Sequence, residues 1–347
     1  MEKRNFGITK NNEEATLYTI SNGRGMSLTA TDFGATVVSI FVKDRDGNTR
    51  DVICGYDEVR PYEENTCYFG ATIGRNGNRI ANSRFTLDGV EYQLDVNDNE
   101  NNLHSGRKGT SARMWKVKGV EESKITFVLE DEEKMQGFPG DAVMEVTYEV
   151  TPENAFRVSY HAVANKKTVF NMTNHAYFNL NGHDSGAVYT QELQLKASHY
   201  TPVKDGKAIP TGEIAPVAGT PFDFREPKAI GRDIHADDEQ LKFVNGYDHN
   251  FALDKTRAGM ERIGSVYAPE SGIEMTIDTD CIGIQLYTGN FITGQIGKGN
   301  VTYVKNGAFC LETQFFPNAI NEENFTSPIT EANVPYETTT SYTFGVR

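Results

Sequence analysis

The sequence lacks several features that mark whole classes of protein. Four cysteines in 347 residues are too few for a disulfide scaffold, and the 32 glycines follow no triplet period, which excludes collagen. Apolar residues are almost as frequent as in an average globular protein, so the chain is not intrinsically disordered. No stretch approaches the ~18 consecutive apolar residues of a membrane-spanning helix. These absences leave a folded protein with a sizeable buried core.

Positive charge is also scarce. Lys and Arg number 34 against 48 Asp and Glu, which gives a formal net charge of −14. Nucleic acids and anionic lipids are bound through basic surfaces, so we expect neither a nucleic-acid partner nor a membrane partner. The first seven residues include Lys3 and Arg4, but no apolar segment follows them, which argues against a signal peptide. No Cys-x-x-Cys pair is present, so we expect reduced cysteines and a cytoplasmic location. The cysteines are Cys54, Cys67, Cys281 and Cys310.

Helical periodicity is rare, and the dominant period is two. Along Ala142–Val150 the even positions are apolar and the odd positions are mostly Glu and Thr, as in a half-buried strand. The alternation resumes over residues 156–164 after a short polar turn, which predicts a hairpin. Asn-Gly or Asp-Gly pairs, which favour hairpin turns, occur at 22–23, 46–47 and 88–89. Further strands are expected at residues 16–20, 39–43, 49–53, 84–87, 90–94, 272–279, 283–287, 301–305 and 308–315.

A short helix is expected at residues 237–244. Many short strands, Gly-rich turns and few helices are typical of all-β sandwiches and barrels. No Pro/Ser linker, charge block or repeat of 20–50 residues divides the chain. We therefore expect one large antiparallel β-sandwich domain covering residues 1–347, with few short helices.

The motifs of common metal and nucleotide enzymes are missing. There is no His-Glu-x-x-His, no Gly-x-Ser-x-Gly and no paired Cys-x-x-Cys. The glycine-rich run at 294–299 has Gly299 where a phosphate loop needs Ser or Thr, and no helix is expected behind it. We interpret this run as a turn, and we expect no cofactor and no metal ion.

Four polar residues stand in unusual local settings. His104 lies in a turn-rich loop, His175 follows an expected strand among aromatic residues, and Asp248 lies in the segment Tyr-Asp-His-Asn. Glu312 interrupts an apolar strand, where a carboxylate is costly unless it is paired or hydrogen-bonded.

Each of these residues has an ordinary alternative. A single loop His is more often structural or solvated than catalytic, and Glu312 could lie on the solvent face of its strand, as Glu145 and Glu149 are expected to do. Arg75 and Arg79 alone are ordinary surface charges. His161 is expected to face solvent, and no role is expected for His183, His199 and His235.

In combination, these segments closely resemble the aldose 1-epimerase (galactose mutarotase) family. The matching blocks keep the family's order and extend from about residue 26 to the C-terminus. They are residues 69–75, 78–80, 102–106, 174–180, 248–251, 285–291 and 311–314. The resemblance implies a large galactose mutarotase-like β-sandwich (a supersandwich) with a sugar cleft on one face.

The resemblance also implies roles for particular residues. Glu312 would be the general base, His175 the general acid, and His104 a supporting group at the sugar ring. The positions that would hold sugar hydroxyls are Asn78, Arg79, Asp248 and Gln285, with Tyr177 as a plausible further contact. We infer that Phe291 or Tyr177 covers the apolar face of the sugar.

The chemistry of anomer exchange agrees with these groups. A proton must leave the C1 hydroxyl while another reaches the ring oxygen, and both transfers reverse when the ring closes again. A carboxylate is ionised near neutral pH, and we expect a nearby anion to keep the His protonated. No metal or redox centre is needed for these steps.

The chain departs from the family's pattern at three places. Ser105 replaces a Gly, Gly77 replaces an Ala, and residues 110–114 replace a Phe-Asp-Lys-like step. None of these positions is the expected acid or base, so they concern the shape of the cleft.

Three functions remain to be compared. The favoured one is an aldose 1-epimerase acting on free hexoses such as galactose and glucose, as a monomer or a homodimer. A sugar-binding protein without turnover would use the same scaffold. A hexose 6-phosphate epimerase would need an Arg or Lys cluster for the phosphate.

Overall fold

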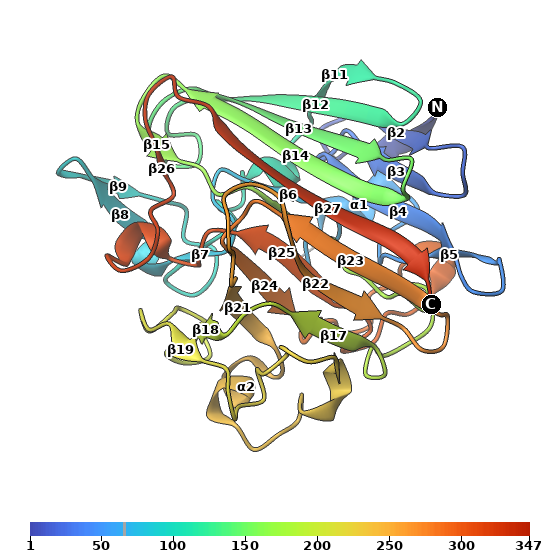
Figure 1. The fold of residues 1–347 in the computed structure, drawn as a ribbon. Coiled ribbons are helices and arrows are strands. Elements are labelled where there is room, and N and C mark those ends of the chain that lie inside the picture. Colours follow the sequence, from blue (N-terminus) through green and yellow to red (C-terminus); the bar gives the residue numbers. More distant parts are fainter. Residues whose placement is uncertain (65–66) are drawn as a thin grey trace.

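Three antiparallel sheets form most of the molecule (Figure 1). The structure is a computed structural model that describes residues 1–64 and 67–347. The largest sheet has nine strands in the order β11-β12-β13-β14-β27-β23-β22-β17-β20. These strands are β11 (Lys116–Val120), β12 (Lys124–Asp131), β13 (Ala142–Val150), β14 (Ala155–Ala164), β17 (Glu192–Leu195), β20 (Lys228–Ala229), β22 (Glu261–Tyr267), β23 (Ile273–Thr279) and β27 (Tyr336–Val346).

Two five-stranded sheets complete the sandwich. The first runs in sequence order from β1 to β5, and the second has the order β19-β18-β21-β24-β25. The first contains β1 (Glu2–Ile8), β2 (Glu14–Ser21), β3 (Ser27–Thr31), β4 (Thr36–Lys43) and β5 (Thr49–Asp51). The second contains β18 (His199–Thr201), β19 (Ala215–Pro216), β21 (Asp248–Ala252), β24 (Gly283–Tyr287) and β25 (Cys310–Gln314).

Short ladders and helices fill the connections. The two-stranded ladders are β6 (Thr72–Ile73) with β16 (Thr173–Asn174), β7 (Arg79–Ile80) with β10 (Asn102–Leu103), β8 (Arg84–Leu87) with β9 (Val90–Gln93), and β15 (Thr168–Val169) with β26 (Ile329–Thr330). The helices are α1 (Val59–Glu63) and α2 (Glu239–Val244), and the 3-10 turns are at Ala81–Ser83, Thr110–Ala112, Ile230–Arg232, Lys298–Asn300 and Ala319–Asn321.

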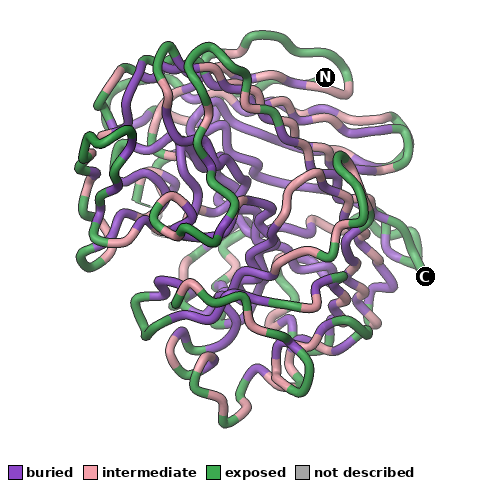
Figure 2. The backbone as a smooth tube through the Cα atoms, turned by 60° about the vertical axis from the view of Figure 1, so that its left-hand side comes forward, coloured by how far each residue is buried: buried purple, intermediate pink, exposed green. Residues whose placement is uncertain are grey.

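One continuous core joins the three sheets. Phe127, Val146 and Phe156 from the nine-stranded sheet pack in the same cluster as Leu28 from the first small sheet and Leu311 from the second. The central strands and the edge strand β25 are buried, while most outer turns and the edge strands β1 and β11 are largely exposed (Figure 2). The all-β sandwich expected from the alternation is confirmed.

The local predictions are confirmed in most places. The β13–β14 hairpin pairs without a register shift from Ala142 to Val150, and Asp88 and Gly89 both have positive φ between β8 and β9, as a two-residue hairpin turn requires. The helix expected at 237–244 is α2, which begins one residue after Asp238. The His161 side chain is 43% exposed and lies beside Glu337.

Two expectations are wrong. Residues 301–305 form no strand, because only Thr302 makes a bridge, to Ile296. Their alternation comes instead from the burial of Tyr303. Its hydroxyl accepts a hydrogen bond from the Gly55 N–H and donates one to the Gly55 carbonyl. Arg75 is not a surface charge: it is completely buried and pairs with Asp131 at 2.6 Å.

Candidate active site

Glu312 projects from β25 into a cavity on one face of the second five-stranded sheet. Alternation along β25 places Cys310, Glu312 and Gln314 on this face, while Leu311 and Thr313 point to the core. The cavity has a volume of about 440 Å³. Glu312 is only 2% exposed, so the alternative in which it faces solvent is excluded.

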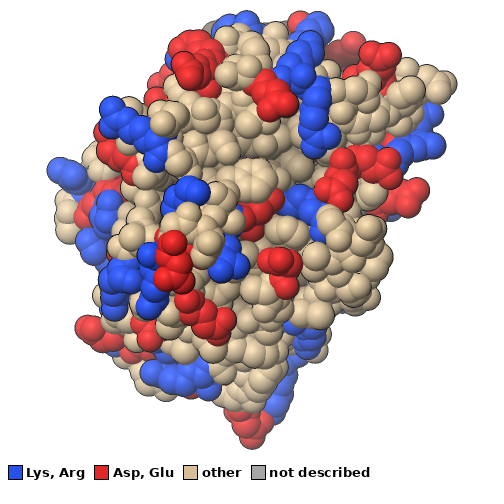
Figure 3. All heavy atoms as spheres, turned by 90° about the vertical axis from the view of Figure 1, so that its right-hand side faces the viewer, with Lys and Arg blue, Asp and Glu red and all other residues tan. Residues whose placement is uncertain are grey.

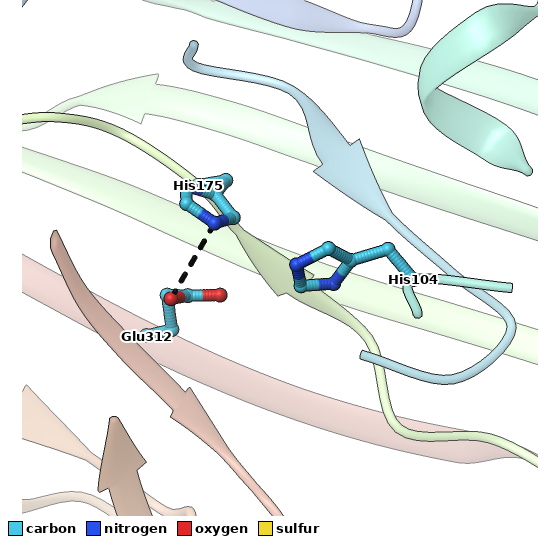
Figure 4. Close-up of side chains that lie close together, drawn as sticks. All are labelled: His104, His175 and Glu312. Carbon is cyan, nitrogen blue, oxygen red and sulfur yellow. Dashed lines mark ion pairs between the residues drawn. The ribbon is translucent and has the colours of Figure 1, made fainter. Parts of the chain in front are cut away.

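His175 faces Glu312 from the segment that follows β16. The Asn174 side chain holds this segment, because it donates to the Gly70 carbonyl and accepts from the Ala176 N–H. The His175 ring lies with Nε2 3.7 Å from Oε1 of Glu312 (Figure 4). Its other nitrogen, Nδ1, lies 3.4 Å from Sγ of Cys310. Both ring nitrogens are therefore in contact with side chains of β25.

His104 approaches from a third segment, just after β10. His104 and Ser105 both have positive φ, a conformation that few residues other than Gly adopt, so the loop turns sharply here. Nδ1 of His104 accepts from the main-chain N–H of Asn78 at 3.1 Å. The neutral ring consequently carries its hydrogen on Nε2, which makes this nitrogen a donor. The ring centroids of His104 and His175 are 5.2 Å apart, edge to face.

A network of charged and amide groups forms the cavity wall beside these three residues. Arg79 donates from Nε to Asp98 at 2.7 Å and approaches Asp248 at 3.9 Å. Gln285 donates from Nε2 to Asp248 at 2.7 Å. Arg79 and Asp248 are thus held in fixed orientations, which suits paired hydrogen bonds to neighbouring hydroxyl groups.

Seven of the eight residues predicted from the sequence line this cavity: Asn78, Arg79, His104, His175, Tyr177, Asp248 and Glu312. The eighth, Gln285, lies beneath Asp248 and does not line it. Phe291, which is half exposed, lies at the cavity. None of His161, His183, His199 and His235 lines it.

Sequence reasoning missed several residues of the site, including Asp98, which lines the cavity and pairs with Arg79. Tyr68 lines the cavity and packs against both imidazoles, with centroid distances of 4.8 Å to His104 and 5.9 Å to His175. No sequence signal distinguishes it. Cys310 contacts His175, and its place two residues before Glu312 on an expected strand could have revealed this.

Burial controls protonation in this site. It raises the pKa of Glu312 well above its usual value; Asp248 adds to this effect and Arg79 opposes it. Burial also lowers the pKa of His175 to about 4, and it lowers that of His104 well below its usual value. The expectation that a nearby anion keeps His175 protonated near neutral pH is therefore wrong, because burial removes the solvation that the charged ring needs.

The geometry of His104 bears on metal binding. Ligand atoms of His104, His175 and Glu312 lie within 4.8 Å of one another, a spacing compatible with a metal ion. A metal-bound imidazole presents a lone pair to the metal and donates its other N–H to an acceptor. In His104 the second nitrogen accepts instead, so Nε2 carries a hydrogen. The donor set therefore fits proton transfer better than it fits a divalent metal.

The departures from the family pattern lie outside the cavity lining. Ser105 is completely buried, and its hydroxyl bonds the main-chain N–H and carbonyl of Asn76. Thr110 donates to the Thr72 carbonyl at 2.6 Å. A Cβ at Gly77 would lie 3.1 Å from the Asn171 carbonyl, so an Ala there would be tight. These residues support the loops behind the cavity.

Comparison with known proteins gives consistent matches. A family model described as aldose 1-epimerase matches residues 16–343. The chain is 39% identical to galactose mutarotase of Sus scrofa over 315 residues, 90% of each chain. It is 36% identical to aldose 1-epimerase of Escherichia coli K12 over 330 residues, 94% of each chain.

Two solved structures have the same fold. A GalM/aldose epimerase homologue from C. elegans superposes with a TM-score of 0.87 and 30% identity, covering 95% of this chain and 98% of that one. Galactose 1-epimerase from Lactobacillus acidophilus NCFM superposes with a TM-score of 0.85 and 26% identity, covering 99% and 98%.

Proposed function

The chain belongs to the aldose 1-epimerase family, and we propose that it interconverts the α and β anomers of free aldohexoses such as galactose and glucose. It is therefore an isomerase. The observation that carries the proposal is the convergence of Glu312, His175 and His104, which are far apart in the sequence, at one cavity large enough for a monosaccharide.

In the proposed mechanism, Glu312 and His175 exchange the proton that they share. Glu312 in its carboxylate form accepts the proton of the C1 hydroxyl, and His175 in its protonated form donates to the ring oxygen, so that the C1–O5 bond breaks and the C1 carbonyl forms. Rotation about C1–C2 and reversal of both transfers give the other anomer. His104 donates a hydrogen bond from Nε2 to the sugar ring oxygen as negative charge develops on it.

The remaining cavity residues hold the sugar. Arg79 and Asp248 present a donor and an acceptor side by side, and Asn78 adds a further polar group. Tyr177 stacks on the His175 ring at 5.1 Å and fixes its plane. Gln285 acts through Asp248 in this geometry. Phe291 covers the apolar face of the pyranose ring.

Replacement of the proposed base tests this mechanism. We expect Glu312→Gln to fold normally and to lose mutarotation by ~10²–10⁴-fold, because an amide cannot accept the C1 proton. Polarimetry of freshly dissolved α-D-galactose measures the rate. Glu145→Gln, a replacement on the outer face of β13, is the matched control and should leave the rate unchanged. A Glu312→Gln variant as fast as the original protein contradicts the mechanism.

The two alternative functions make different predictions. In the described part of the chain, Arg79 is the only Lys or Arg that lines the cavity, and both neighbouring carboxylates already engage it. We therefore expect faster turnover of glucose than of glucose 6-phosphate. A protein that binds galactose in calorimetry but leaves anomer exchange at the buffer rate would instead be a non-catalytic binder.

We also propose that the chain acts in the cytoplasm as a single β-sandwich domain, monomeric or homodimeric. Cys54, Cys281 and Cys310 carry thiols, which suits a reducing compartment. Across residues 1–64 and 67–347, neither helix approaches the length and hydrophobicity of a bilayer-crossing segment. On the face in Figure 3, acidic and basic side chains are intermixed. Analytical ultracentrifugation measures the oligomeric state.

A further inference from the structure

Three buried amide side chains lie in the sheet that carries Glu312. Asn250 on β21, Gln285 on β24 and Gln314 on β25 are each at most 3% exposed. In the described part of the chain, the amide nitrogen and the amide oxygen of Asn250 and of Gln314 lack hydrogen-bonding partners. Oε1 of Gln285 and Oε2 of Glu312 lack partners as well. Buried polar atoms are rarely left unpaired in proteins, so this concentration requires an explanation.

The strand register brings these groups together. Asn250 pairs with Gln285, and Gln285 pairs with Glu312, so the three side chains form one row across β21, β24 and β25. Directly opposed side chains on one face of a sheet are close neighbours. Gln314 follows Glu312 by two residues and therefore shares its face.

Two glycines let neighbouring groups lie close to the sheet beside the amides. Gly283 lies opposite Gln314, and a Cβ there would lie 2.7 Å from Oδ1 of Asn250 and 2.8 Å from the Phe316 ring. The Asn250 amide thus extends along the sheet, from its own row toward that of Gln314. A Cβ at Gly77 would lie 3.6 Å from Oε1 of Gln314. We call the region bordered by Asn250, Gln285, Gln314, Gly283 and the Phe316 ring the amide chamber.

The amide chamber and the sugar cavity meet at Glu312. Glu312 lines the cavity, whereas Asn250, Gln285 and Gln314 do not. Oε1 of Glu312 faces His175, and Oε2 is the oxygen without a partner. Gln314 also borders a second hollow of about 570 Å³ that none of the catalytic residues lines, which places the chamber between the two.

We propose that the amide chamber holds a buried water cluster that hydrogen-bonds Oε2 of Glu312 and stabilises its carboxylate form. Asn250 and Gln314 offer amide N–H donors, and all three amides offer acceptor oxygens. Water both donates and accepts, and buried waters in proteins typically make about three hydrogen bonds, so this mixed set suits water. The water site follows from the contacts alone, whereas its effect on catalysis rests on the proposed function.

Other groups also act on Glu312 and must be kept constant in a test. The titratable or charged side chains that face it from the surrounding elements are His104, His175, Tyr177, Arg79, Asp248, Cys310 and Tyr342. None of them is altered in the variants below.

A high-resolution crystal structure of the unaltered protein tests the water site. We expect ordered waters that bridge the amides of Gln314 and Asn250 to Oε2 of Glu312. Direct contact between these amides and the carboxylate, without water, overturns the proposal. This result does not depend on activity, so it is independent of the proposed function.

Gln314→Met and Asn250→Leu test the effect on Glu312, since each removes an amide and keeps a similar volume. We expect the ¹³C NMR titration of the Glu312 carboxyl to move about one unit to higher pH. We expect kcat for galactose to fall about tenfold with KM unchanged, because the carboxylate form becomes rarer. Tyr160→Phe is the control, because it removes a buried hydroxyl without a partner on β14. It should change neither the Glu312 titration nor kcat.

The outcomes separate the two levels of the proposal. An unchanged Glu312 titration in both folded variants overturns the role of the chamber. A shifted titration in a protein whose unaltered form has no mutarotase activity would support the chamber and reject the proposed function. If one variant fails to fold, the other variant and the crystal structure still decide the outcome.

Discussion

At the scale of single residues, the proposed exchange of one proton between His175 and Glu312 predicts how the rate depends on pH. In this mechanism the pair is active only while it carries one proton, because Glu312 must be deprotonated and His175 must be protonated. Burial lowers the pKa of His175 to about 4 and raises that of Glu312. Below about pH 4 the pair gains a second proton, and above the raised pKa of Glu312 it loses its last one.

We therefore predict a bell-shaped profile of kcat/KM with its acid limb centred near pH 4. The measurement is polarimetry across the pH range with subtraction of the buffer-catalysed rate. An acid limb near pH 6.5, the value of an unperturbed imidazole, would show that burial does not control His175.

The Cys310 thiol leads to a second prediction. Burial raises the pKa of Cys310 well above its usual value, so the group is a thiol that donates to Nδ1 of neutral His175 and accepts from the charged ring. We expect Cys310→Ala to lower kcat about fivefold with KM unchanged, since one net hydrogen bond contributes ~1 kcal/mol.

Cys310→Ser is the matched control, because a hydroxyl keeps both hydrogen-bonding roles. It should stay close to the rate of the original protein. The ¹⁵N shifts of His175 report its tautomer in each variant, and an Ala variant with unchanged rate and tautomer would show that the thiol only fills space.

At the scale of elements, alternation predicted strands well wherever a ladder forms, as in β13 and β14. It failed at residues 301–305, because one-sided burial against a loop produces the same period as a strand. Short helices depend on their ends. Asp238 caps α2 by accepting from the N–H groups of Gln240 and Leu241.

We predict that Asp238→Ala lowers the free energy of unfolding by about 1 kcal/mol, the usual cost of a lost N-cap. Asp238→Asn keeps an acceptor oxygen at the N-cap, so it should lower the free energy of unfolding by only a few tenths of a kcal/mol. Urea unfolding followed by circular dichroism measures both. Because Val244 at the end of α2 lines the cavity, a rise in KM should accompany the loss of stability.

At the scale of the whole molecule, Arg75 ties the loop before Asn78 to the nine-stranded sheet. Its guanidinium donates to the Asp131 carboxylate and to the carbonyls of Pro139 and Gly140. Both partners of the ion pair are buried. The cavity wall is thereby anchored to a sheet that contributes none of the proposed catalytic groups.

We predict that Arg75→Ala destabilises the protein by ~3–5 kcal/mol, because it breaks a buried ion pair and leaves Asp131 only the partly exposed Arg113 as an ionic partner. Arg262→Ala, which breaks an exposed pair with Asp278, is the control and should cost less than ~1 kcal/mol. Thermal and urea unfolding measure both. Equal effects of the two variants would show that burial of the Arg75 pair is unimportant.

The sequence alone determined the all-β class and the hairpins, and its motifs pointed to most of the residues that meet at the cavity, because alternation and motif order are local properties of the chain. Tertiary structure alone decided that Glu312 faces inward, that Arg75 is buried and that Gln285 lies beneath Asp248. It also decided that burial keeps His175 from holding its proton by itself near neutral pH. The reason is physical: alternation shows which residues share a face, but packing by distant segments determines which face loses its water and therefore which charges are stable there.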